Sequence, residues 1–86
     1  MVDKTSLFNL EDIDAGVIRT TLTEVNDALE ERGYNATNQI VGYLISGDPG
    51  YISSYQDARN KIQDLDRAKI VEILLDEFQK NNKWDI

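Results

Sequence analysis

Acidic side chains are the most abundant groups in this chain that could take part in chemistry, with 16 Asp and Glu against 9 Lys and Arg. Carboxylates serve as cation ligands and as general acids or bases. Asp64 and Asp66 have the spacing that begins a calcium-binding loop. However, Ala68 stands where a third oxygen ligand belongs, and Lys69 stands where the sharp turn requires glycine. We therefore expect no metal site and interpret these carboxylates as solvent-exposed.

The residue types best suited to nucleophilic and acid–base catalysis are missing from the sequence, which has no cysteine and no histidine. Thiolate chemistry and disulfides are thereby excluded. The commonest metal ligand and the usual base near neutral pH are missing as well. Because no nucleophile–base pair remains, we expect no catalytic residue, no cofactor and no enzymatic activity.

Gly47-Asp48-Pro49-Gly50 is a glycine-containing loop that could be mistaken for a phosphate cradle. It lacks the lysine and the glycine spacing of a P-loop, and the Asp48 carboxylate would repel a phosphate. The loop is therefore interpreted as a turn that ends a helix.

Four basic residues gather in the second half of an otherwise acidic chain: Arg59, Lys61, Arg67 and Lys69. One interpretation is a set of exposed ion pairs with the neighbouring Asp57, Asp64 and Asp66, which is the commoner case and is favoured. The alternative is a receptor for an acidic or phosphorylated segment, with Arg59 and Arg67 contacting the phosphate.

Two hydroxyl side chains, Thr5 and Ser6, lie near the start of the sequence. Phosphorylation of one of them would add about −1.5 to −2 charges. The added charge would either detach the apolar Phe8–Leu10 segment from an acidic body or attach it to Arg59 and Arg67. The sequence leaves both outcomes open.

The bulk properties describe one small acidic domain of 86 residues with a net charge of −7. Nucleic acids and anionic membranes are disfavoured as partners because both require a basic surface. No apolar run approaches the roughly 20 residues that span a bilayer, so direct membrane insertion is not expected. The opening residues 1–6 do not resemble a secretory signal, which favours a cytoplasmic protein. A domain this small often needs disulfides, metal or a partner subunit, and here oligomerisation is the support that remains.

The apolar spacing predicts an all-α protein, a compact bundle of about four helices covering residues 15–32, 36–46, 55–63 and 67–80. Asp14 is the expected N-cap of the first helix. That helix has an apolar stripe of Ile18, Leu22, Val25 and Leu29. The fourth helix is expected to have a stripe of Ile70, Val71, Leu74, Leu75 and Phe78, broadened by Ile73.

The second helix has clear signals at both ends, with Gly33 and Asn35 before it and Gly47 after it. Gly42 in its interior costs roughly 1 kcal/mol relative to alanine. Such a cost indicates that another backbone or an aromatic ring comes close at this point.

The apolar face of the second helix is expected to be buried against a second copy of the chain. Its residues are Ile40, Val41, Tyr43, Leu44 and Ile45. Residues 40–45 are also rich in strand-forming types, but the matched helix signals on both sides favour a helix. A symmetric dimer would bring each such patch against its own copy.

Several strings along the chain are similar to the signature of one family: Gly33-Tyr34-Asn35, Asn38-Gln39-Ile40-Val41-Gly42-Tyr43, Ser46-Gly47-Asp48-Pro49, Tyr51-Ile52 and Asp57-Ala58-Arg59-Asn60. They resemble the IreB family of small regulatory phosphoproteins, as do Thr5, Phe8, Asn9 and Leu10. Ala36 stands where the family commonly has proline, and both residues are compatible with the start of a helix.

The resemblance implies a cytoplasmic, all-helical homodimer of Gram-positive bacteria. It also implies a substrate of a membrane-anchored PASTA-type Ser/Thr kinase and its cognate phosphatase. The implied role is a negative regulator in cell-envelope stress and cephalosporin resistance. The family's phosphoacceptor maps onto Thr5, while a second, upstream acceptor has no match because Val2 and Asp3 occupy that region. Whether Ser6 is a second acceptor stays open, and the downstream protein partner is not identified.

We therefore expect a flexible N-terminal regulatory segment over residues 1–13 and a helical dimerising domain over residues 14–86. Trp84–Ile86 forms a short apolar tail whose docking the sequence does not decide. The predicted function is regulation by binding under kinase control. The alternative is a non-phosphorylated structural protein–protein interaction scaffold.

Overall fold

The computed structural model describes residues 10–82, and the side-chain environments from residue 14 onward. Four α-helices make up most of this part: α1 (Leu10–Glu31), α2 (Ala36–Ser46), α3 (Ala58–Gln63) and α4 (Arg67–Asn81). Two 3-10 turns, η2 (Pro49–Tyr51) and η3 (Tyr55–Asp57), lie between α2 and α3. The predicted all-α class is confirmed, and residues 10–82 contain no strand.

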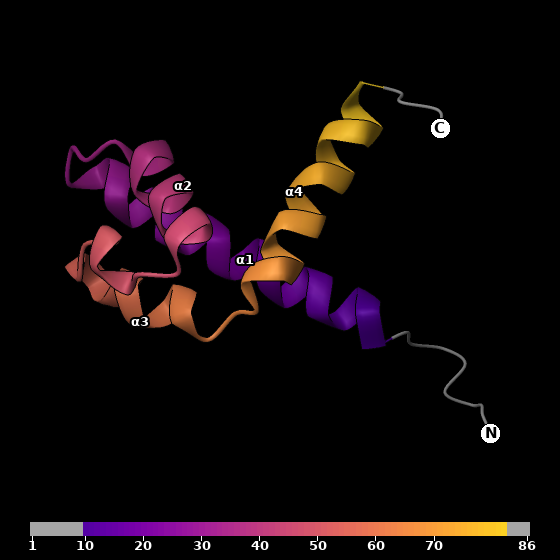
Figure 1. Cartoon of the computed structure of the whole chain (residues 1–86), viewed down its shortest axis with the longest axis horizontal. Coiled ribbons are helices and arrows are strands. Elements are labelled where there is room, and N and C mark those ends of the chain that lie inside the picture. Colours follow the sequence, from indigo (N-terminus) through magenta and orange to yellow (C-terminus); the bar gives the residue numbers. More distant parts are fainter. Residues whose placement is uncertain (1–9, 83–86) are drawn as a thin grey trace.

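Helix α1 is the long element on which the rest of the structure is built (Figure 1). It begins at Leu10, so the prediction that Asp14 caps its N-terminus is wrong. Acidic residues in a first turn interact favourably with the positive end of the helix dipole, and no glycine or proline interrupts residues 10–15. These features extend the helix by more than a turn. Its predicted stripe is confirmed, because Ile18, Val25 and Leu29 are buried and Leu22 is partly buried against them.

The ends of α2 follow the predicted signals closely. Gly33 takes a φ of 85° beyond the end of α1, and Tyr34 N–H donates to the Leu29 carbonyl at 2.9 Å. The Asn35 side chain accepts a 3.0 Å bond from the Asn38 N–H. Gly47 has a φ of 78°, and its N–H donates to the Tyr43 carbonyl at 2.7 Å. Glycine adopts such left-handed φ values without strain, which explains its use after both helices. The predicted bounds of α2, residues 36–46, are confirmed.

The predicted single helix over residues 55–63 is wrong, because the chain breaks after one 3-10 turn. Gln56 and Asp57 have φ values of 50° and 65°, which non-glycine residues rarely adopt. The break lets Ala58 enter the core, where it is fully buried. It also lets the Gln56 amide donate to the Glu31 carboxylate at 3.2 Å. The Arg32 guanidinium lies 5.2 Å from the Tyr55 ring centroid. Tertiary contacts therefore override the local helical preference here.

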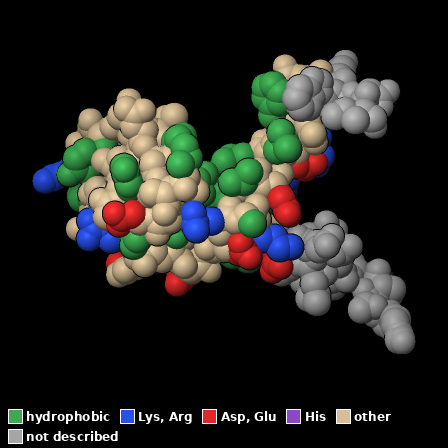
Figure 2. All heavy atoms as spheres, in the orientation of Figure 1, with side chains coloured by type: hydrophobic (Ala, Val, Ile, Leu, Met, Phe, Trp, Pro, Cys, Tyr) green, Lys and Arg blue, Asp and Glu red, His purple; other side chains and the backbone are tan. Residues whose placement is uncertain are grey.

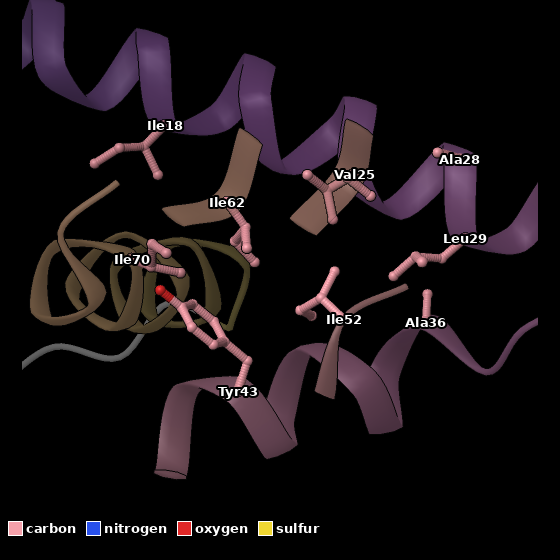
Figure 3. Packing of buried hydrophobic residues seen from close by; sticks show 10 residues of the cluster. Ile18, Val25, Ala28, Leu29, Ala36, Tyr43, Ile52, Ile62 and Ile70 are labelled. Carbon is pink, nitrogen blue, oxygen red and sulfur yellow. The ribbon is translucent and has the colours of Figure 1, made fainter. Parts of the chain in front are cut away.

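The core lies between α1 and α2, and the residues of the following segments fill the space between them (Figure 3). Its largest fully buried side chains are Leu29, Ile52, Ile62, Ile70 and Val25. The Tyr43 ring points from α2 toward this cluster, and only 5% of the residue is exposed. One small cluster thus joins all four α-helices.

Helix α4 begins in the core and then leaves it. The Asp66 carboxylate caps the helix by accepting a 2.9 Å bond from the Ala68 N–H. Ile70 is buried and Ile73 packs against the core, but the rest of α4 rises away from the body (Figure 1). The predicted stripe is therefore split. Four of its members are about half exposed: Val71, Leu74, Leu75 and Phe78.

Gly42 of α2 lies directly against the ring of Tyr51 from η2. A Cβ at position 42 would overlap that ring, lying 2.9 Å from Cε1 and closer still to Cδ1. The prediction that a ring or backbone approaches this glycine is confirmed. The absence of a side chain at residue 42 is what allows the 3-10 segment to pack on α2.

Gly42→Ala is expected to lower the free energy of unfolding by roughly 1 kcal/mol, since displacing the Tyr51 ring outweighs the better helix propensity of alanine. Urea denaturation of the full chain measures this change.

In a Tyr51→Ala background the ring is gone, and the same substitution should instead stabilise the protein by about 0.5–1 kcal/mol. Equal effects of Gly42→Ala in the two backgrounds would contradict the packing argument.

Candidate functional site

The acidic residues and the glycine loop form ordinary surface structure in the described region. Within residues 10–82, no three acidic side chains converge in a way that would hold a metal ion. The Asp48 carboxylate accepts a 2.8 Å bond from the Gly50 N–H and caps η2, as expected for a turn. In the same range, none of the helices combines the length and hydropathy needed to cross a bilayer.

The predicted interface residues of α2 fall into two groups. Tyr43 lies in the core of this subunit, and Ile40 and Leu44 are partly buried against the same core. Val41 is about half exposed and Ile45 is 80% exposed. Only the second group offers its side chains freely to another molecule.

A second apolar surface lies on α4. The sequence predicted an apolar stripe there but not an interface. Green side chains follow the projecting helix in Figure 2. Val71, Leu74 and Leu75 contribute to it, each about half exposed. The spacing of three and four residues indicated an apolar face, but it could not show that the face points away from the core.

A groove of about 370 Å³ runs between the first half of α1 and α4. Its apolar lining includes Ala15 and Ile18 of α1 and Ile73 and Leu75 of α4. Its charged lining consists of Asp14, Lys69, Glu72 and Asp76. The lining therefore combines apolar side chains with more acidic than basic ones. An ion pair of 2.6 Å between Arg19 and Glu77 joins the same two helices.

Arg59 and Arg67, the candidate phosphate contacts, each hold part of the backbone in place. The Arg59 Nε donates to the Ile52 carbonyl at 2.7 Å, which fixes the segment that enters the core. The Arg67 Nη1 donates to the Leu44 carbonyl at 3.0 Å, near the negative end of α2. A Cβ on Gly47 would lie 2.9 Å from the Arg67 Cζ, so the guanidinium packs closely on that glycine. Both arginines thus have structural partners in the folded chain.

The other basic residues do not follow the favoured sequence interpretation in detail. Lys61 pairs with Glu24 of α1 at 3.5 Å, where a neighbouring aspartate was expected. Asp57 instead accepts a 2.9 Å bond from the Asn60 side chain, and Asp66 caps α4. The fold brings α1 against α3, and so supplies Lys61 with a partner that lies far away in the sequence.

Tyr34 lies in the turn between α1 and α2 and contacts Ser53 in the segment after η2. Hydrogen bonds from Ser53 and then Arg32, together with the positive charge of Arg32, lower the pKa of Tyr34 below its ordinary value. The Ser53 N–H also donates to the Gln39 side chain at 2.9 Å. These polar contacts bind the 3-10 segment to α2.

Thr5, Ser6 and the tail Trp84–Ile86 lie outside the described residues. The predicted phosphorylation site belongs to the segment that precedes Leu10, the first residue of α1.

The sequence matches the model of a known protein family. A family model described as IreB regulatory phosphoprotein matches residues 3–80, which cover nearly all of the chain. The matched range includes Thr5, helices α1 to α3, all of α4 except its last residue, and both arginines that bond the backbone.

Arg59→Met is expected to lower the free energy of unfolding by about 1.5–3 kcal/mol, because its charged donor to the Ile52 carbonyl is partly buried. Arg67→Met, at an exposed site, should cost only about 0.5–1 kcal/mol. Urea denaturation at neutral pH would rank the two.

Lys80→Met is the matched control, since the Lys80–Asp76 pair at 3.2 Å is an exposed pair within one helix. Such a pair contributes about 0.3–0.5 kcal/mol. If Arg59→Met cost no more than Lys80→Met, the structural role assigned to Arg59 would be wrong.

Proposed function

We propose that this chain, which belongs to the IreB family of regulatory phosphoproteins, is a cytoplasmic regulator whose activity is set by phosphorylation at Thr5. The modifying enzymes would be a membrane-anchored PASTA-type Ser/Thr kinase and its cognate phosphatase. The output would be negative regulation in cell-envelope stress and cephalosporin resistance, through binding to a downstream protein. The observation that carries the proposal is the family match over residues 3–80.

Three of the other hydroxyls are engaged in the fold, which supports Thr5 as the acceptor. Thr23 donates to the Arg19 carbonyl at 2.8 Å within α1, and Ser46 donates to the Gly42 carbonyl at 2.7 Å within α2. The Ser53 hydroxyl accepts a 3.1 Å bond from the Tyr55 N–H. A kinase would have to disrupt these contacts before it could phosphorylate those residues.

Incubation of the full chain with the cognate kinase and ATP should place phosphate on Thr5, as located by mass spectrometry. Thr5→Ala should abolish the incorporation, whereas Ser6→Ala should leave it unchanged. Phosphate found only at Ser53, Ser54 or the threonines of α1 would contradict the assignment.

A pull-down from cell extract with Thr5→Ala and Thr5→Glu would separate the regulator from the alternative, a structural scaffold. A regulator should capture its downstream partner to different extents with the two variants. Equal capture by both would favour the scaffold.

We also propose that the chain forms a symmetric homodimer in which α2 contacts its own copy, with Val41 and Ile45 in direct contact and Ile40, Tyr43 and Leu44 supporting them from within the subunit. The 80% exposure of Ile45 on an otherwise ordered apolar helix supports this arrangement. Burial of a large aliphatic side chain contributes about 1.5–3 kcal/mol.

Ile45→Asp should raise the dimer dissociation constant roughly thirtyfold or more, as expected when about 2 kcal/mol of central contact is lost. Because Ile45 lies outside the core, the monomer should remain folded. Analytical ultracentrifugation and circular dichroism on the same sample test both expectations.

Leu74→Asp on α4 is the control, since Leu74 is also exposed and apolar but lies on a different surface. A monomeric Leu74→Asp variant beside a dimeric Ile45→Asp variant would contradict the proposed α2 contact and move the interface to α4.

A further inference from the structure

The groove between α1 and α4 lies next to the point where the N-terminal segment enters the fold. Asp14 lines the groove and comes four residues after Leu10, the first residue of α1. Four residues of helix correspond to about 6 Å. The segment that precedes α1 is therefore attached beside the groove.

The segment before Leu10 has the side chains that such a groove accepts. Leu7 and Phe8 are adjacent large apolar residues in a stretch that is otherwise mostly polar. The apolar lining of Ala15, Ile18, Ile73 and Leu75 matches them. The groove volume of about 370 Å³ falls at the small end of the roughly 300–1,000 Å³ typical of ligand pockets.

The reach of the chain permits this contact. Residues 5 to 10 span about 17 Å when extended, at about 3.3 Å per residue. Because Leu7 and Phe8 are three and two residues from Leu10, they have enough chain to turn back onto the first half of α1 and across to α4.

The charges around the groove make the contact sensitive to phosphate. Asp14, Glu72 and Asp76 outnumber Lys69 in the lining, and Lys80 pairs with Asp76 at 3.2 Å, so the net charge at the groove is −1 (three carboxylates against two ammonium groups). Residues 3–9 contain one acid, Asp3, and one base, Lys4, and are neutral overall. A phosphate on Thr5 would bring about −1.5 to −2 charges beside this lining.

We infer that Leu7 and Phe8 dock in the α1–α4 groove of their own subunit, and that phosphorylation of Thr5 releases them. The inference rests on the proposed function for the identity of the phosphoacceptor. Release exposes the apolar lining of the groove, including Leu75, to a partner protein. The groove is thus covered in one phosphorylation state and open in the other.

The test is nuclear magnetic resonance on the full chain with methyl-labelled Ile and Leu. In the unmodified protein, the ring protons of Phe8 should show short-range nuclear Overhauser effects to the methyl groups of Ile18, Ile73 and Leu75. Phe8→Leu assigns these signals by removing them. If the signals were absent from the unmodified protein, the inference would be overturned whether or not the kinase phosphorylates Thr5.

Phosphothreonine introduced at position 5 during translation should reduce the docking equilibrium constant about tenfold, from repulsion by the acidic lining. Persistence of the Phe8 signals at full strength would overturn the switch. In the Glu72→Gln, Asp76→Asn double variant, the same phosphate should have a several-fold smaller effect. This comparison does not require the kinase. A kinase that fails to phosphorylate Thr5 would therefore contradict the proposed function without changing the docking result.

Two matched variants locate the contact. Leu75→Ser should weaken docking without unfolding the chain, because the residue is half exposed. Leu74→Ser, similarly exposed on α4 but outside the groove lining, should leave docking unchanged. Mixing labelled with unlabelled protein identifies the subunit that is contacted, and signals found only between copies would overturn docking within the subunit.

Discussion

The burial of a few large aliphatic side chains between α1 and α2 is the constraint on which the rest of the structure depends. Ile52, Ile62 and Ile70 come from three different segments and are fully buried at one place. With no disulfide to support it, this cluster is the main source of stability in a chain of 86 residues. The chain between α2 and α4 therefore turns sharply to bring these residues together. One such turn uses the left-handed backbone conformations of Gln56 and Asp57.

A core of this size can hold only the beginning of α4. Ile70 completes the cluster, and from there the helix continues away from the body, so that Leu74 and Leu75 remain half exposed. Apolar residues that would be buried in a larger domain here become surface available for binding. The divergence of α1 and α4 also creates the groove, whose acidic lining follows from the polar sides of two amphipathic helices meeting at an angle. The possible binding surfaces are thus consequences of limited core volume.

Arginines illustrate how the fold changes the meaning of a sequence feature. Arg59 and Arg67 form part of a basic cluster in an acidic chain, which permits either ion pairs or a phosphate receptor. In the structure both donate to main-chain carbonyls, of Ile52 and Leu44 respectively. Arg59 thus holds the segment after η2, and Arg67 holds the end of α2. Any contact with phosphate would have to use the guanidinium N–H groups that do not bond these carbonyls. The partner of Arg67 lies 23 residues away in the sequence, so the spacing of basic residues gave no sign of this contact.

Local signals were enough to predict α2 correctly, because Gly33, Asn35 and Gly47 each act on backbone groups within a few residues. They were also enough to predict the buried stripe of α1 and a close neighbour at Gly42. The family resemblance depended on the same strings and was confirmed over residues 3–80. Three features were decided only by the tertiary structure: the break after η3, the packing of Tyr51 against Gly42, and the exposed side of α4. Each of these depends on which distant segments share a small core, and apolar periodicity within one helix does not contain that information.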